Sequence, residues 1–424
     1  MMARVTAPQP MLLTGRLVTA SSVVEAGAVV VEGDAIRYAG PASGLPARWR
    51  DAPPVDAGPG RRTLLPGLVD VHCHGGAGGE FGAAADSAAT AVRHHHLSGT
   101  TSVVGSLVSA AADEMVAGVR TCAGLVAGGE LAGIHLEGPF LSHERRGAQD
   151  PAALTDVDPA LVEDVVLAAE SAGAPGAVAQ MTYAPERGAG RLPTLLGGHR
   201  ILPALGHTDC DAATAWASLR SAHEAAPRGG RPLVTHVFNG MPPLHHRDPG
   251  PVAACLAQAG RGEAVLEVIG DGVHLSAETV RMLFDLVGPQ AICLVTDAMA
   301  ASGMPDGSYT LGGREVTVAD RTARLADGGS IAGGVATLLD VVRWCVTEAG
   351  IPLLDAVTAA SVTPAQAIGL PEVGSLAAGH RADVVVVDDD LRAMRVMRRG
   401  SWLVPGVPGV PGVLDVPDVL DSDR

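Results

Sequence analysis

The chain has 424 residues, of which 47% are hydrophobic, enough to bury one large core and a smaller second one. Its formal net charge of −16, without a cluster of basic residues, argues against nucleic acid as a partner. No apolar run reaches the roughly 20 residues that cross a bilayer, and the six scattered cysteines form no CxxC pair. We therefore expect a cytoplasmic protein with no membrane contact and no disulfide framework.

The two ends of the chain share one pattern. Residues 11–64 read as short strands separated by Gly and Asp turns, and residues 373–402 repeat this pattern. We predict that residues 1–63 and 373–403 pair into a small β-sandwich domain. Residues 404–424 are rich in Pro and Gly and then acidic, which predicts a flexible tail.

Between these ends, over residues 64–372, β-branched apolar runs alternate with Ala-rich helical stretches. The predicted strands are 64–74, 99–108, 131–138, 178–185, 201–209, 232–240, 264–274 and 291–299. The predicted helices are 83–97, 109–128, 159–173, 210–226 and 276–288. Eight such strands predict an α/β fold, a (β/α)8 barrel of the TIM type, which takes about 250 residues. An open nucleotide-binding sheet is the alternative, but the Gly-rich run 75–82 lacks the GxGxxG spacing.

Five of the predicted strands end in histidine or a carboxylate. These residues are His72, His74, Glu137, His207, His236 and Asp297. Strand alternation places His72 and His74 on one face and Cys73 on the other. An ordinary polar strand end explains any one of them, but buried imidazoles and carboxylates are costly as a set unless they are paired or bind a metal. We predict a divalent metal site, for Zn²⁺ or Fe²⁺, at the strand ends. Because the chain has no lysine, any bridge between two ions would come from Glu137.

Two further polar segments accompany the strands. Three consecutive histidines, 94–96, fall in a predicted helix whose turn separates their rings, so we expect them at the surface and outside any ligand set. The polar segment 141–150 reads as a lid loop over the pocket. His143 in this loop is a candidate substrate contact, with a solvated loop position as the alternative.

Several longer sequence motifs resemble those of a known protein family. They include PGLVDVHCHG (66–75), GIHLEGPFL (133–141), HVFNGMPPLHHRDPG (236–250) and LVTDAMAASG (294–303). With these motifs, from about Leu12 to Trp402, the sequence resembles the amidohydrolase superfamily and, within it, the N-acetylglucosamine-6-phosphate deacetylases. The resemblance implies hydrolysis of N-acetyl-D-glucosamine 6-phosphate to D-glucosamine 6-phosphate and acetate, in amino-sugar catabolism and cell-wall recycling. The alternatives are another deacylase or deaminase of the superfamily, or a non-catalytic barrel that only binds.

The resemblance also implies roles for individual residues. Glu137, His207 and His236 would hold one ion, and His72, His74, Glu137 and Asp297 a second, giving one or two ions per subunit. Asp297 would act as general base and then as general acid. The implied substrate-binding residues are Ala148, Asn239, Gly240, Arg247, Asp271, His274, Ile331, Ala332 and Gly333. Family members form homodimers in which the residue matching Arg247 reaches the neighbouring site, and the planar guanidinium suits a phosphate.

Overall fold

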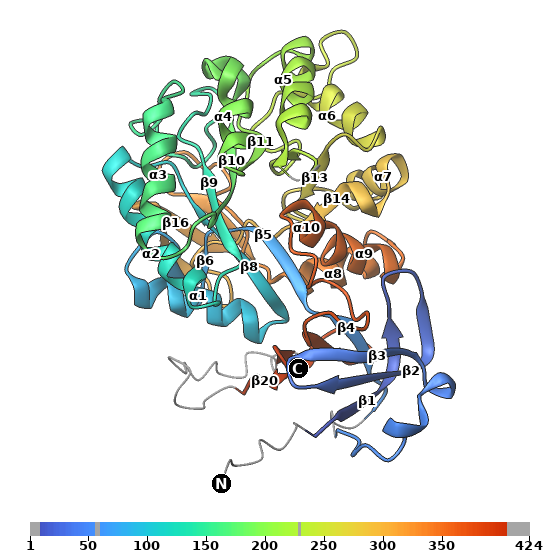
Figure 1. Cartoon of the computed structure of the whole chain (residues 1–424). Helices are drawn as coiled ribbons and strands as arrows, with labels where there is room; N and C mark the ends of the chain where they lie inside the picture. The colour runs from blue at the N-terminus through green and yellow to red at the C-terminus, as the bar shows by residue number, and fades with distance from the viewer. Residues whose placement is uncertain (1–8, 56–59, 228–229, 405–424) are drawn as a thin grey trace.

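The computed structural model describes residues 9–55, 60–227 and 230–404 (Figure 1). The predicted tail, apart from Val404, lies outside the described residues. The described chain forms a barrel, with a smaller β domain built from the first and last segments beside it.

The central sheet is a parallel (β/α)8 barrel, as predicted. Its strands are β5 (Leu68–Cys73), β8 (Thr100–Leu107), β9 (Gly133–Glu137), β10 (Val178–Tyr183), β11 (Leu202–Leu205), β12 (Leu233–Val234), β13 (Val265–Val268) and β14 (Ile292–Leu294). The segment after β14 closes the barrel onto β5, because Asp297 N donates to His72 O (2.9 Å) and His74 N donates to Ala298 O (2.7 Å). The closed ring brings the carboxyl ends of all eight strands to one face.

Helices follow the strands around the barrel. They are α1 (Ala85–Leu97), α2 (Ala112–Ala127), α3 (Pro159–Ser171), α4 (Leu192–Gly198), α5 (Ala212–Ala225), α6 (Gly250–Gly260), α7 (Ala277–Val287), α8 (Leu338–Thr347), α9 (Leu353–Ala359) and α10 (Val362–Ala367). The five predicted helices correspond to α1, α2, α3, α5 and α7. Side-chain caps mark several starts, such as the capping box of Thr337 and Asp340 at α8.

The small domain joins both ends of the chain, as predicted (blue and red in Figure 1). Its strands are β1 (Met11–Val18), β2 (Val23–Glu32), β3 (Ala35–Pro41), β4 (Thr63–Pro66), β18 (Val384–Val387), β19 (Ala393–Arg398) and β20 (Ser401–Trp402), in the order β20-β19-β18-β4-β1-β2-β3. The sheet folds back on itself, since Ile36 N donates to His380 O (2.9 Å) and Ala382 N to Asp34 O (2.7 Å). Leu13, Val29 and Val384 belong to the core that this folding encloses.

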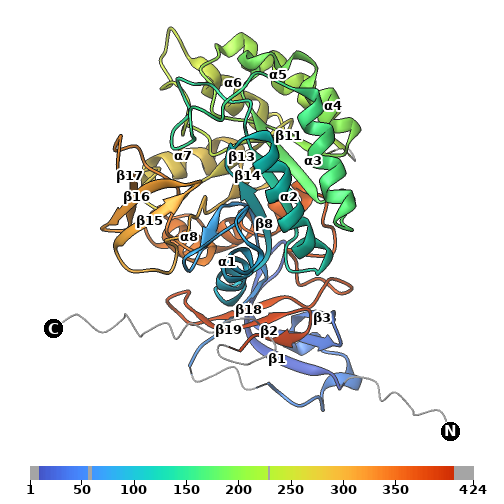
Figure 2. The same ribbon diagram turned by 90° about the vertical axis from the view of Figure 1, so that its left-hand side faces the viewer.

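A three-stranded antiparallel sheet, absent from the sequence prediction, is inserted between β14 and α8. Its strands are β15 (Gly307–Leu311), β16 (Arg314–Ala319) and β17 (Thr322–Leu325). Figure 2 shows this sheet on one side of the barrel. The β16 strand alternates buried Val316 and Val318 with exposed neighbours, so one face of the insertion packs against a core of its own.

The surface prediction for the three consecutive histidines was wrong for two of them. His95 and His96 are buried in α1, and His94 is half-buried. His95 Nε2 donates to Gly75 O (2.8 Å), and the ring of His94 lies against Gly76 and Gly303. The helix therefore places histidines, not aliphatic side chains, in its contact with the loop after β5.

Acidification is expected to weaken the folded state through this helix. Burial, followed by the neighbouring His95, lowers the pKa of His94 from 6.5 to about 3. Between these pH values the unfolded chain binds a proton that the folded chain does not, so stability present above pH 6.5 is lost as the pH falls toward 3. In urea unfolding between pH 7 and 4, His94→Gln should reduce the pH slope of the unfolding free energy by up to about 1.4 kcal/mol per pH unit.

The matched control is His223→Gln, which changes an exposed histidine on α5. Its pH slope should equal that of the wild type. An unchanged slope in His94→Gln would contradict the assignment.

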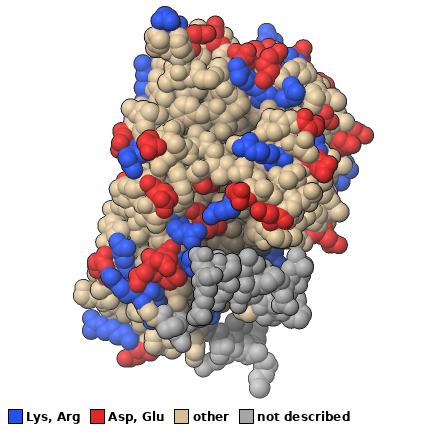
Figure 3. Space-filling view, turned by 180° about the vertical axis from the view of Figure 1, so that it is seen from behind, with Lys and Arg blue, Asp and Glu red and all other residues tan. Residues whose placement is uncertain are grey.

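On the face shown in Figure 3, arginine and acidic side chains are interspersed. Among the described helices, none combines the length and apolar character needed to cross a bilayer.

Candidate active site

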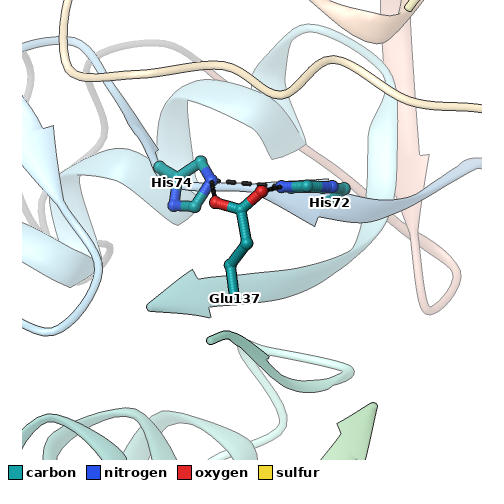
Figure 4. Close-up of side chains that lie close together, drawn as sticks. All are labelled: His72, His74 and Glu137. Atoms are coloured by element: carbon teal, nitrogen blue, oxygen red, sulfur yellow. Dashed lines mark hydrogen bonds and ion pairs between the residues drawn. The ribbon is translucent and has the colours of Figure 1, made fainter. Parts of the chain in front are cut away.

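The six strand-end residues converge at the carboxyl face of the barrel. Glu137 lies at the centre: its Oε1 is 3.0 Å from His207 Nε2 and 2.9 Å from His236 Nε2. On its other side, Oε2 lies 3.2 Å from His74 Nε2, and Oε1 lies 3.4 Å from His72 Nε2 (Figure 4). Two overlapping groups thus share Glu137, one with His72 and His74 and one with His207 and His236.

Asp297 joins the first of these groups. Its Oδ1 lies 3.2 Å from His74 Nε2 and 3.4 Å from His72 Nε2. Cys73 points away, as strand alternation predicts, and its Sγ contacts His95 Nε2 at 3.1 Å. The thiol therefore faces α1 and not the site.

The donor and acceptor roles at this centre suit a cation. His207 Nδ1 must donate to the Arg145 carbonyl oxygen (2.8 Å), so in the neutral ring Nε2 presents a lone pair. That lone pair faces Glu137 Oε1, which is also an acceptor, and the Nε2 of His236 at 3.0 Å. His207 Nε2 and Glu137 Oε1 are then two buried acceptors that face each other, which is unfavourable unless a proton or metal ion lies between them. Buried imidazole and carboxylate ligands of this kind fit Zn²⁺ or Fe²⁺.

The backbone turns sharply where the ligands stand. His207 (φ 47°), His236 (φ 27°) and Asp297 (φ 48°) all have positive φ angles, which non-glycine residues adopt at a cost of about 1–3 kcal/mol. The turn that contains His236 ends β12 at Val234, whereas the sequence pattern predicts a strand up to residue 240. Such strain at three ligand positions indicates that the surrounding barrel fixes their direction.

Opposite charges hold this centre in its ionised form. Burial would raise the pKa of Asp297, but His72 and His74 outweigh it and lower the pKa to about 2. Burial likewise opposes ionisation of Glu137, yet His72 and His207 hold its pKa well below the usual range. Asp297 is therefore a carboxylate at neutral pH and able to accept a proton.

A cavity of about 310 Å³ opens beside these ligands. Of the predicted substrate-binding residues, its walls include Ala148, Asn239, Gly240, His274, Ile331 and Gly333. The other four candidates lie apart from these walls. Ala332 is fully buried, and Asp271 accepts from His274 Nδ1 (2.9 Å), so it orients that ring. Arg247 is exposed, with His246 Nε2 2.9 Å from its Nη1, and the carbonyl of half-buried His143 accepts from Arg146.

Four wall residues, Gly147, Gln149, Leu311 and Ser330, were not among the predicted site residues. Gln149 donates through Nε2 to Glu137 Oε2 (2.6 Å) and accepts from Ser109 N (2.7 Å), so it ties the lid loop to the central carboxylate. Leu311 and Ser330 come from the inserted sheet and the segment after it. Only the proximity of Gln149 to Glu137 in sequence could have suggested it, because an amide in a loop follows no periodic pattern.

Both a protein-family model and individual relatives match this chain. Residues 210–404 match the model of the amidohydrolase family. N-acetylglucosamine-6-phosphate deacetylase of Bacillus subtilis is 32% identical over 81% of this chain and 85% of its own length. The human enzyme of the same name is 35% identical over 81% of this chain and 83% of its own. N-acetylgalactosamine-6-phosphate deacetylase of Escherichia coli O157:H7 is 32% identical over 80% of this chain and 87% of its own length.

The fold gives the same grouping. A variant of N-acetyl-D-glucosamine-6-phosphate deacetylase from Mycobacterium smegmatis, solved in complex with N-acetyl-D-glucosamine-6-phosphate, superposes with a TM-score of 0.84 at 38% identity. The superposition covers 93% of this chain and all of that one. The chain therefore belongs to the amidohydrolase family and groups there with these deacetylases.

Proposed function

We propose that this protein hydrolyses the acetamido group of N-acetyl-D-glucosamine 6-phosphate, giving D-glucosamine 6-phosphate and acetate, in amino-sugar catabolism and cell-wall recycling. The observation that carries the proposal is the convergence of Asp297 with the Glu137-centred histidines beside a 310 Å³ cavity. The relatives named above supply the substrate class. Six buried thiols without a disulfide, all in the described chain, support a cytoplasmic location.

Asp297 carries the proton transfers in this proposal. Its carboxylate accepts a proton from the water that attacks the acetyl carbonyl, and then delivers that proton to the departing amine. His274, held by Asp271, lines the cavity, where its ring can donate to the substrate. No serine or cysteine nucleophile takes part.

The same residues would hold one or two divalent ions, Zn²⁺ or Fe²⁺. Glu137, His207 and His236 would form one site, and His72, His74, Glu137 and Asp297 the other. When bound, such an ion supplies a Lewis acid that polarises the carbonyl and activates water.

Arg247 is our candidate for the phosphate contact. It lies outside the cavity walls of its own chain and is exposed, which fits a residue that reaches the site of a partner subunit in a homodimer. Its guanidinium can bind phosphate oxygens through two parallel hydrogen bonds.

A substrate panel tests the proposal. Wild type should prefer N-acetylglucosamine 6-phosphate over unphosphorylated N-acetylglucosamine by about 10²-fold or more in kcat/KM, as expected for charged hydrogen bonds of about 1.5–3 kcal/mol each. N-acetylgalactosamine 6-phosphate, measured beside them, reports the sugar preference. Arg247→Ala should lose activity mainly on the phosphorylated sugars, while Arg191→Ala, which changes another exposed arginine, should not. Failure of metal-loaded wild type to release acetate from either phosphorylated sugar would overturn the substrate assignment.

Complementation tests the dimer. If Arg247 acts in the partner's site, mixing Arg247→Ala with Asp297→Asn subunits regenerates one intact site in each mixed dimer. Activity should then reappear in the mixture, although each variant alone is impaired. Mixed dimers without regained activity would place Arg247 elsewhere.

Arg314 of the inserted sheet is expected to support substrate binding. Its Nη1 donates to Ala148 O (3.1 Å) and Gln149 O (3.3 Å), while Nη2 pairs with both carboxylate oxygens of Asp327. Arg314→Ala should raise KM about tenfold with a smaller change in kcat, because hydrogen bonds from a charged donor contribute about 1.5–3 kcal/mol. Steady-state kinetics beside Arg324→Ala provide the check, since Arg324 donates to Gly329 O (2.9 Å). Equal KM values for both variants would contradict the expectation.

A further inference from the structure

Glu267 is a fully buried carboxylate next to the candidate metal centre, and none of the functional roles described above involves it. It lies on β13, where it is paired in register with Cys293 of β14. Its Oε2 lies 2.8 Å from His72 Nδ1 and accepts from His236 N (3.3 Å), and its Oε1 accepts from Gln180 Nε2 (3.4 Å). Groups from β5, β10 and the turn after β12 thus meet one carboxylate inside the barrel.

The contact with His72 fixes which ring nitrogen carries the proton. Both oxygens of Glu267 already accept from N–H groups, so the side chain acts here as an acceptor and His72 Nδ1 donates to it. The neutral ring then presents the lone pair of Nε2. That atom is the one directed at His74, Glu137 and Asp297, at 3.1, 3.4 and 3.4 Å.

His72 differs in this respect from the other histidines of the centre. The buried Nδ1 atoms of His74 and His236 have no hydrogen-bond partner within the described residues. His207 Nδ1 donates to a backbone carbonyl, which no side-chain substitution removes. Among these four histidines of the described structure, only His72 therefore has its second ring nitrogen hydrogen-bonded to a side-chain carboxylate.

We propose that Glu267 is a positioning residue that keeps His72 in its ligating tautomer and thereby sets the affinity of the ion site formed by His72, His74, Glu137 and Asp297. The site formed by Glu137, His207 and His236 depends on it much less. This inference rests on the proposed function only in assuming that the centre binds divalent metal. A carboxylate that accepts from a ligating imidazole raises the basicity of the ring, and losing it typically weakens metal binding 10–100-fold.

The test measures metal binding, not sugar turnover. Full-length wild type, Glu267→Gln and Glu267→Leu are stripped of metal and titrated with Zn²⁺ against a chromophoric chelator, which gives the number of ions bound and each dissociation constant. Wild type should bind two ions. In Glu267→Leu one of the two sites should lose about 10–100-fold in affinity, while the other changes little. Glu267→Gln should fall between them, because its amide oxygen still accepts from Nδ1 through an uncharged hydrogen bond.

Asp383→Asn is the matched control for losing a buried carboxylate. Asp383 is 2% exposed, accepts from Thr101 Oγ1 (3.0 Å) and Arg399 N (2.8 Å), and touches none of the ligands. This variant should lose thermal stability yet bind both ions as the wild type does. Wild-type affinities at both sites in Glu267→Leu, or binding of only one ion by wild type, would overturn the inference. Two ions with the expected ordering but no sugar turnover would leave the inference standing and remove only the proposed substrate.

Discussion

Asp297→Asn is expected to lower kcat about 10²–10⁴-fold, the range that a positioned general acid–base contributes. The asparagine amide keeps the shape of the side chain but can neither take the proton of the attacking water nor return it to the amine. Because the amide has nearly the same size as the carboxylate, KM should change little. Acetate release under steady-state conditions measures both constants.

Asp297 is also a candidate metal ligand, so the metal content of the variant must be measured in the same preparation. Asp285→Asn, which changes an exposed aspartate on α7, is the matched control and should behave as wild type. If Asp297→Asn kept wild-type kcat with its metal bound, another residue would have to act as the base.

Glu137→Gln is expected to have the widest effect, because Glu137 is common to both ligand groups. An amide replaces the one charge that faces all four imidazoles, so neither ion site should retain its affinity. Loss of the ion that polarises the carbonyl should reduce kcat at least about 10³-fold, the upper effect of removing one oxyanion donor. Elemental analysis should find less than one ion per chain.

Thermal unfolding separates loss of metal from loss of fold. Ions that bind only the folded chain stabilise it by about 2.7 kcal/mol at a concentration 100 times the dissociation constant. Added Zn²⁺ should therefore raise the Tm of stripped wild type and leave that of Glu137→Gln nearly unchanged. An equal rise in both would show that the ions bind elsewhere.

The barrel was predictable because its signal is local. Apolar β-branched runs alternate with Ala-rich helices, and five of the runs carry a histidine or carboxylate at the end where parallel strands converge. Glu137, His207 and Asp297 could be singled out for that reason, and in the structure their side chains do meet around one centre.

Features made by contacts between loops were not predictable in the same way. Gln149 reaches Glu137 only because the segment 141–150 folds back toward it, and Arg314 reaches that segment from an insertion about 165 residues later in the chain. The pairing of Glu267 with His72 joins residues 195 positions apart. No periodic pattern in either segment encodes such contacts. The burial of His95 and His96 was missed because polar composition was taken as a surface signal, whereas His95 packs against the loop after β5 and His96 lies beside Glu130.

The most direct test of the central claim is the metal dependence of acetate release from N-acetylglucosamine 6-phosphate. The stripped full-length protein should release no acetate, and activity should return in proportion to the Zn²⁺ or Fe²⁺ bound at the Glu137-centred site. Turnover by protein shown to contain no metal would contradict the account, as would the absence of turnover when the site is fully loaded.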